Sequence, residues 1–424
     1  MISRVFKAFR YRDFRLMWIG ACTSSIGTWM QIVAQGWLIY RISHSAALLS
    51  LDQFLGGIPI LLLSLLGGVV ADRFERRRIL LISQYVQMAS AGTLTILVTT
   101  GLLGERVWPI LCLSFVSGVA QAFGGPAYQA LIPTLVEKED MPNAIALNSI
   151  QFNLAVVLGP ALAGLTLARL GEKWCFGLNA LSFLAPIISL SIIRTRFLPK
   201  KTTESMYSSL KQGIRFVRKQ ASMEALIVLA FCMTAFSAPM RAYFPVFVQD
   251  IYHGGPQTYG NLLTLMGLGS IGGSLMIAGA GHLGKRGRVA LAAIFCLGAA
   301  GAGFSFSRSL PQGGAMVLLA GVSMMAAFAS VSSLVQLITT DDMRGRVMSV
   351  YNVAFRGGMP LGNLLAGALV RGVVLRALVV RGVVLLRPFH IPPLPVPLVV
   401  RLDGTLLALV ALYFLVVQRR VARL

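Results

Sequence analysis

Long apolar runs separated by short polar connections dominate the chain. A helix needs about 20 apolar residues to cross a hydrocarbon core of about 30 Å. The pattern predicts an all-α polytopic membrane protein with twelve transmembrane helices, of which the short twelfth is doubtful. The predicted spans cover residues 14–39, 47–71, 79–101, 108–132, 143–168, 174–193, 223–249, 258–281, 289–307, 312–338, 347–370 and 404–418.

The 38 Lys and Arg residues are distributed unevenly over the connections. Twenty-six fall in the N-terminal residues up to Arg15, in the C-terminus and in the connections that follow even-numbered spans. Five fall in the connections that follow odd-numbered spans before residue 371. Because positively charged loops are retained in the cytoplasm, we expect both termini on the cytoplasmic side.

The longest polar connection lies near the middle of the chain. It predicts an N-terminal six-helix half over residues 1–194, a basic cytoplasmic linker over 195–221 and a C-terminal six-helix half over 222–424. Within the linker, Ser205 to Gln220 is expected to form an amphipathic surface helix. Two six-helix halves are one architecture of secondary transporters. Consistent with an internal repeat, Asp140-Met141 before the fifth span recurs as Asp342-Met343 before the eleventh.

Composition excludes a soluble protein. Hydrophobic residues make up 56% of the chain, against about 45–50% in soluble domains. The net charge of +23 would by itself suggest a nucleic-acid partner. Since most of this charge falls in the predicted cytoplasmic connections, we expect anionic membrane lipids as partners and no nucleic acid.

Candidate catalytic and metal-binding groups are sparse. The five Cys and four His lie far apart and without metal-ligand spacing, so we expect no metal and no other cofactor. No clustered His/Asp or Ser/His set is formed by the scattered His, and no phosphate-binding G-x-x-x-x-G-K-[ST] loop occurs that would indicate ATP-driven pumping. We therefore expect no enzyme. A membrane enzyme acting on lipids and a non-transporting sensor or scaffold are the alternatives from other classes.

The connection after the second span carries the most specific motif. Residues 68–78 read G-V-V-A-D-R-F-E-R-R-R. This resembles the G-x-x-x-D-R-x-G-R-R/K signature of the major facilitator superfamily, with Glu75 in place of a Gly. A carboxylate at a helix end can pair with an Arg or with a helix N-terminus. The resemblance implies a conformational latch formed by Gly68, Asp72, Arg73, Arg76 and Arg77.

The fifth span contains a second motif. Residues 159–164 read G-P-A-L-A-G, which resembles the G-P-x-x-G-G element of exporters in the same superfamily. The resemblance implies a role in antiport for Gly159, Pro160 and Gly164. Close packing of helices through small residues would explain the same pattern.

Three further segments are similar to one branch of the superfamily. They are residues 11–16, 123–133 and 355–362, which read Y-R-D-F-R-L, F-G-G-P-A-Y-Q-A-L-I-P and F-R-G-G-M-P-L-G. They resemble the transmembrane secretion effector branch, which includes the enterobactin exporter. This resemblance implies a monomeric, proton-coupled exporter of small organic molecules, siderophore- or drug-like, in the bacterial cytoplasmic membrane. A lipid flippase or lysophospholipid importer of the same fold is the alternative.

Ionisable residues inside membrane spans are rare and are functional candidates. Asp52 is the candidate for the transported proton, although an interfacial carboxylate would occupy the same position. Arg241 and Arg356 are candidates for substrate binding; outward snorkelling of Arg241 and a structural pairing of Arg356 are the alternatives. Uncharged polar candidates for the lining of a substrate cavity are Gln31, Gln35 and Gln121.

Residues 371–403 depart from the pattern of the rest of the chain. The run V-R-G-V-V-L occurs twice, beginning at Val370 and at Val380, and a cluster of Pro follows. Five Arg would then lie on the external side, against the charge bias. We interpret this anomalous segment as an out-of-frame or duplicated insertion, or as an external loop particular to this lineage.

Overall fold

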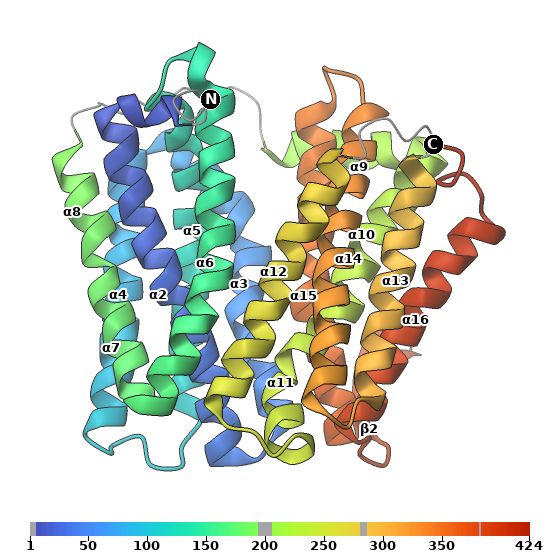
Figure 1. Ribbon diagram of the computed structural model, residues 1–424. Helices are drawn as coiled ribbons and strands as arrows, with labels where there is room; N and C mark the ends of the chain where they lie inside the picture. Colours follow the sequence, from blue (N-terminus) through green and yellow to red (C-terminus); the bar gives the residue numbers. More distant parts are fainter. Residues whose placement is uncertain (1–5, 194–205, 280–285, 381–382) are drawn as a thin grey trace. The chain divides into compact units, whose positions relative to one another are not determined.

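A computed structural model of the chain describes residues 6–193, 206–279, 286–380 and 383–424 (Figure 1). Long helices form nearly all of this part. In the first half they are η1 (Lys7–Arg10), α2 (Arg12–Ser43), α3 (Ala46–Arg73), α4 (Arg76–Thr99), α5 (Trp108–Leu131), α6 (Met141–Arg169), α7 (Glu172–Ser182) and α8 (Leu184–Ile192).

The second half begins with α9 (Met206–Lys219), which confirms the helix expected within the basic linker. The remaining elements are α10 (Ala221–Ala242), α11 (Phe244–Val246), η4 (Phe247–Ile251), α12 (Pro256–Gly279), α13 (Arg286–Phe306), α14 (Leu310–Leu337), α15 (Arg344–Arg371), β1 (Val373–Val380), β2 (Val383–His390) and α16 (Val396–Val416).

The predicted spans are confirmed by these helices. Within the described residues, eleven helical stretches are long and apolar enough to cross a membrane. The additional long helix is α2, whose 32 residues exceed the length required. Its middle is more polar than that of the other long helices because it carries Ser, Thr and Gln side chains. The amide network described below accounts for two of these Gln.

Proline explains why two predicted spans are interrupted. The sixth span divides into α7 and α8 around Phe183, three residues before Pro186. The seventh divides at Tyr243, two residues before Pro245. A proline has no N–H for the carbonyl four residues earlier and its ring crowds that carbonyl, so the helix ends or bends before it.

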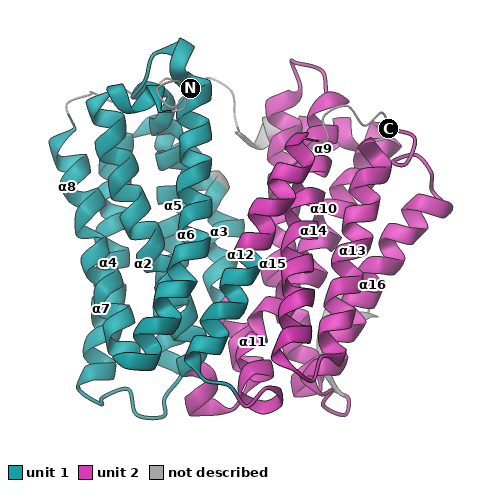
Figure 2. Ribbon diagram, in the orientation of Figure 1, with its two compact units in different colours: residues 1–38, 55–209, 254–267 teal, residues 39–54, 210–253, 268–424 magenta. Residues whose placement is uncertain are grey.

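The described chain divides into two compact units, each of which takes segments from both sequence halves (Figure 2). Unit 1 comprises residues 1–38, 55–209 and 254–267, and unit 2 comprises residues 39–54, 210–253 and 268–424. Both α3 and α12 therefore begin in one unit and end in the other.

Unit 1 is held together at one end by a cluster of large apolar side chains. Phe14 and Met17 of α2 pack there with Leu80 of α4, Leu131 of α5 and Leu147 of α6. Further from that end, small residues let the backbones of α3 and α5 approach. A Cβ added at Gly67 would lie 2.3 Å from the carbonyl oxygen of Ala122.

Unit 2 depends on close backbone contacts between α13 and α16. A Cβ added at Gly404 would lie 2.4 Å from the backbone nitrogen of Ala302, and one added at Gly298 would lie 2.5 Å from that of Ala408. Interfaces of small residues are typical of membrane helices, because dispersion contacts between close backbones stabilise the pair without a hydrophobic driving force. The contact fixes the depth of α16 relative to α13.

The twelfth helix begins eight residues earlier than the sequence pattern predicts. Residues 396–403, which we assigned to the anomalous segment, form the first two turns of α16. Pro397 is tolerated because a helix has no partner for its first N–H groups. The guanidinium of Arg401 lies 3.7 Å from the ring centroid of Phe306 on α13, so its charge is accommodated within the unit.

The earlier part of the anomalous segment forms an antiparallel hairpin. Strand β1 pairs with β2 in a register that places Val373 opposite His390 and Val380 opposite Val383. Gly372, at φ 73°, ends α15 in the left-handed conformation that glycine adopts without strain. The sequence pattern did not predict this hairpin.

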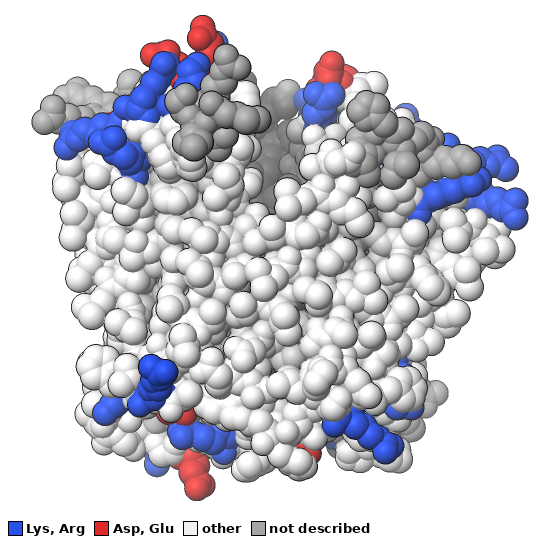
Figure 3. All heavy atoms as spheres, viewed as in Figure 1, with Lys and Arg blue, Asp and Glu red and all other residues white. Residues whose placement is uncertain are grey.

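Charged side chains gather at the two ends of the helices on the face shown in Figure 3, and the broad middle of that face is uncharged. This distribution is what a hydrocarbon environment requires of exposed side chains. Exposed apolar residues such as Leu62, Leu275 and Leu365 lie within the membrane helices. The surface therefore suits lipid rather than water.

We expect Gly404→Ala to lower the melting temperature more than Gly92→Ala. Both changes add one methyl group within a helix, but a Cβ at Gly92 meets nothing within 4 Å. Overpacking typically costs about 1–3 kcal/mol. Thermal unfolding of the purified variants in detergent measures the difference. Equal melting temperatures would show that the contact between α13 and α16 is not tight.

Candidate functional site

Arginines of the motif after α3 hydrogen-bond carbonyl oxygens at the C-terminal ends of neighbouring helices. Arg76 donates hydrogen bonds to the carbonyl oxygens of Ala71, at 3.2 Å, and Ala130, at 3.0 Å. These carbonyls belong to the last turns of α3 and α5, where no N–H group of the helix remains to bind them. The carboxylate of Asp72 lies 3.7 Å from the guanidinium of Arg76. Cations are favoured at helix C-termini, so Arg76 ties two such ends together.

The next residue of the motif repeats this arrangement on another helix. Arg77 donates hydrogen bonds to the carbonyl oxygens of Ser191, at 2.9 Å, and Ile193, at 3.3 Å, at the end of α8. Glu75 stands where the superfamily signature has Gly, and its φ of −62° is ordinary for any residue. The substitution therefore causes no backbone strain here. Arg73 is exposed, and Gly68 is a half-buried residue of α3.

The motif of the fifth span packs α6 against two other helices of unit 1. A Cβ added at Gly159 would lie 2.3 Å from the Cβ of Trp29 on α2. Gly164 faces α12, where a Cβ added at Gly260 would lie 2.7 Å from both the Cα of Gly164 and the carbonyl oxygen of Pro160. The glycines therefore permit backbone contact on both sides of α6, as small-residue packing requires.

Two of the three candidate amides form a network inside unit 1. Asn179 of α7 donates a hydrogen bond of 2.7 Å to Gln31. Gln31 and Gln35 are linked at 3.4 Å, and Gln35 donates to the hydroxyl of Ser114 on α5 at 2.8 Å. The third amide, that of Gln121, does not join them and is exposed. The structure thus brings Gln31 and Gln35 together with two residues that the sequence did not single out.

The three ionisable candidates lie in unit 2 and differ in exposure. Asp52 of α3 is buried, at 4% of its full exposure. Arg241, in the last turn of α10, is half-buried and directs its guanidinium towards the sulfur of Met359 at 3.7 Å. Arg356 lies in the middle of α15 and is exposed.

Two buried groups in unit 2 were missed by the sequence analysis. Tyr243, fully buried after the end of α10, accepts a hydrogen bond of 2.8 Å from Ser50 of α3. Asp403 is buried in α16 at 9% exposure, and its Oδ2 has no hydrogen-bond partner. A carboxylate within an apolar run is the signal that would have found Asp403. It was excluded because we began the twelfth span one residue later.

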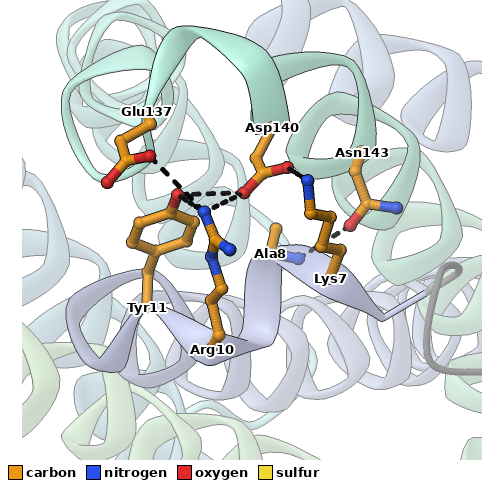
Figure 4. Close-up of polar contacts among 7 residues, drawn as sticks. All are labelled: Lys7, Ala8, Arg10, Tyr11, Glu137, Asp140 and Asn143. Atoms are coloured by element: carbon orange, nitrogen blue, oxygen red, sulfur yellow. Dashed lines mark hydrogen bonds and ion pairs between the residues drawn. The ribbon is translucent and has the colours of Figure 1, made fainter.

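Before α6, one carboxylate anchors the N-terminal turn of the chain (Figure 4). Asp140 forms ion pairs with Lys7, at 2.7 Å, and with Arg10, at 2.8 Å, and it accepts a hydrogen bond from Tyr11 at 2.9 Å. Its side chain is 1% exposed. The backbone N–H of Ala8 also donates to the side-chain oxygen of Asn143, at 2.8 Å. These contacts fasten η1 to the beginning of α6.

The ammonium of Lys7 is the main cause that lowers the pKa of Asp140, and Tyr11 and Arg10 lower it further. The carboxylate therefore stabilises the fold at neutral pH, and its contribution is lost only as the pH falls through this lowered pKa. Asp342, its counterpart in the sequence repeat, also has a lowered pKa, mainly because of a hydrogen bond with Thr340. The two Asp residues of the sequence repeat, Asp140 and Asp342, thus interact with different partners.

Metal ligands do not converge in the part of the chain that the structure describes, where no group of three or more His, Cys, Asp or Glu is placed to hold an ion. The polar groups of the spans are instead amides, hydroxyls, arginines and single carboxylates. Such groups can bind organic solutes and protons.

Solved structures of transporters have the same fold. The structure is similar to the nucleoside transporter NupG, with a TM-score of 0.70 at 13% identity, covering 95% of this chain and 98% of that one. It is also similar to a POT family transporter in complex with a thioalcohol-conjugated peptide, with a TM-score of 0.71 at 10% identity over 97% and 96% of the two chains. The helices, their order and these likenesses define a multi-pass membrane protein of the major facilitator fold.

The particular family follows from the sequence. Residues 3–392 match the family model described as "Transmembrane secretion effector", and the chain belongs to this family of the major facilitator superfamily. The match ends four residues before α16.

Relatives in several bacteria are efflux or siderophore transporters. The multidrug efflux pump Tap of Mycolicibacterium fortuitum is 26% identical over 83% of this chain and 88% of its own. Macrolide efflux protein A of Streptococcus pyogenes is 23% identical over 84% and 90%. The staphyloferrin A transporter of Staphylococcus aureus is 23% identical over 80% and 85%. The chain is accordingly a multi-pass protein of a bacterial membrane.

We expect Asp140→Asn to lower the melting temperature more than Asp341→Asn does. Asp341 pairs with Arg344 at 2.6 Å but is 88% exposed, so water replaces its partner readily. Loss of the charge at Asp140 leaves two cations without their shared partner. Thermal unfolding at neutral pH measures both variants, and an equal shift would show that burial of Asp140 is immaterial.

Proposed function

We propose that the chain is a proton-coupled secondary transporter that exports small organic molecules, siderophore- or drug-like, by alternating access across the bacterial cytoplasmic membrane. The observation that carries the proposal is the similarity, over 80–84% of the chain, to relatives named for multidrug efflux, macrolide efflux and staphyloferrin A transport. The buried carboxyl of Asp52 supports proton coupling. Burying an ionisable group within a membrane is energetically costly, so such residues are candidates for a function.

Substrate contact is assigned to two arginines and three amides. Arg356 is exposed at mid-helix, where its planar guanidinium can form two hydrogen bonds to an anionic group of a solute. Arg241, near the end of α10, is a second cationic candidate. Gln31, Gln35 and Gln121 supply amides that can donate and accept.

The conformational latch is assigned to the motif after α3. Asp72, Arg73, Arg76 and Arg77 lie at helix ends, where the arginine bonds to carbonyl oxygens stabilise one arrangement of the helices. Alternating access requires such contacts to form in one state and to break in another. The antiport role is assigned to Gly159, Pro160 and Gly164, whose small size permits the close contacts of α6 with α2 and α12.

The excess of basic residues in alternate connections favours both termini in the cytoplasm. The two sequence halves, 1–194 and 222–424, then each supply six spans, joined by the basic linker 195–221. The protein works as a monomer surrounded by lipid. Its cytoplasmic Lys and Arg contact anionic lipid headgroups.

We expect inverted membrane vesicles with an acidic interior to accumulate at least one of erythromycin, staphyloferrin A and ethidium. Protons leaving the vesicle drive the compound inwards.

We expect Arg356→Ala to weaken uptake of an anionic compound by about ten- to a hundred-fold, because a charge-assisted hydrogen bond contributes about 1.5–3 kcal/mol. Asp52→Asn should abolish the response to the gradient. Arg308→Ala, which changes an exposed Arg in the connection before α14, is the matched control.

Uptake that is undiminished when the gradient is dissipated would contradict proton antiport. Movement of a fluorescent lysophospholipid without opposing proton flow would favour the lipid-transport alternative. Wild-type rates in both Arg356→Ala and Asp52→Asn would show that these residues do not bind substrate or proton.

A further inference from the structure

We propose that Asp403 is a second proton-binding carboxyl of unit 2, required for coupling proton movement to transport. The proposal rests on the proposed function of a proton-coupled exporter. It concerns a residue outside the matched family region, which ends at residue 392.

The position of Asp403 is the first observation. It lies two turns inside α16, is only 9% exposed, and has an Oδ2 atom with neither hydrogen-bond partner nor access to solvent. Its neighbour Gly404 is locked against Ala302 of α13 by backbone contact. The helix therefore cannot slide or turn to bring this carboxyl to water without breaking that contact.

Among the described side chains, no cation is paired with Asp403 to compensate an ionised carboxylate. Arg401, two residues earlier on the same helix, lies over the ring of Phe306 and hydrogen-bonds Ser305 at 3.4 Å. On α13, Arg286 and Arg288 lie at the opposite end, because α16 and the residues after it reach that end with Val421 against Gly287. On α10, Arg241 points to Met359.

A buried phenol follows the end of α10 that approaches α16. Tyr243 is fully buried, and a Cβ added at Gly301 of α13 would lie within 4 Å of both Met240 at that end of α10 and Gly404 of α16. Tyr351 on α15 is also buried. The other titratable or charged side chains of the packed helices are exposed or half-buried; they are Glu224 and Cys232 on α10, Cys296 on α13, Arg344, Arg346, Arg356 and Arg371 on α15, and Tyr413 on α16.

The phenol is hydrogen-bonded to α3. Ser50 donates its hydroxyl hydrogen to the oxygen of Tyr243, which leaves the phenol hydrogen for another acceptor. Ser50 in turn lies against α15, where a Cβ added at Gly367 would be 2.7 Å from the Cβ of Ser50. Ser50 and Tyr243 thus form a buried polar pair in the same unit as Asp403.

A bound proton resolves the energetic problem of this site. An ionised carboxylate taken out of water costs several kcal/mol unless a cation or hydrogen-bond donors compensate it. Binding a proton at Oδ2 forms an O–H bond and removes the charge. Releasing the proton to water requires a state of the transporter in which the site is hydrated. The site therefore binds a proton in one conformation and releases it in another, as coupling requires.

The test compares wild type, Asp403→Asn, Asp403→Glu and the exposed control Asp341→Asn in proteoliposomes with the same three compounds. We expect Asp403→Asn to lose gradient-driven accumulation while exchange of labelled for unlabelled compound stays within about twofold of wild type. Asp403→Glu should retain coupling in part, and Asp341→Asn should match wild type. Retained exchange shows that the Asn variant is folded.

A second measurement follows the proton site without transport. Dicyclohexylcarbodiimide reacts with protonated carboxyls in apolar surroundings, and peptide mass spectrometry locates the adduct. We expect labelling at residue 403 that declines as the pH rises. Coupled transport in Asp403→Asn, or no labelling of residue 403 at any pH, would overturn the proposal. Wild-type transport that ignores the gradient would instead overturn the proposed function, and this proposal with it.

Discussion

Hydrocarbon offers no hydrogen bonds, so each polar group within the bundle has to be satisfied by another part of the same chain. This constraint explains most of the specific contacts in both units. Arg76 and Arg77 donate hydrogen bonds to carbonyl oxygens at helix ends, where no backbone N–H group of the same helix is available to bind them. The amides of Gln31 and Asn179 satisfy one another across two helices. A carboxylate at the membrane boundary, Asp140, is surrounded by two cations and a hydroxyl.

The positions of the helices could be predicted from the sequence because hydropathy alone decides where a chain can cross a membrane. The end of α15 and the whole of α5 follow from runs of apolar residues and the polar groups beside them. The start of α16 could not, because it depends on its partner: α13 supplies the ring over which Arg401 lies. The breaks at Phe183 and Tyr243 were not predicted either, although Pro186 and Pro245, which explain them, are visible in the sequence.

The candidate site was predictable to the extent that charge in a membrane is rare. Asp52, Arg241 and Arg356 stand out in any scan of the spans, and the structure places all three in unit 2. Which side chains they approach depends on how each helix is rotated about its axis, and this rotation cannot be read from the sequence. For the same reason the partners of Gln31 and Gln35 were not predicted. The hydrogen bond between the hydroxyls of Ser50 and Tyr243, which are 193 positions apart, was not predicted either.

The glycine contact between α13 and α16 also has a consequence for biosynthesis. Gly298 and Gly404 are about 100 residues apart, and a ribosome adds about 5–20 residues per second. For some 5–20 s, therefore, α13 enters the bilayer with its small-residue face exposed to lipid instead of to its partner. Unit 2 cannot be completed until the final stretch of the chain has been made. Any truncated product that lacks α16 would present this unfilled groove, which distinguishes incomplete molecules from finished ones for membrane quality control.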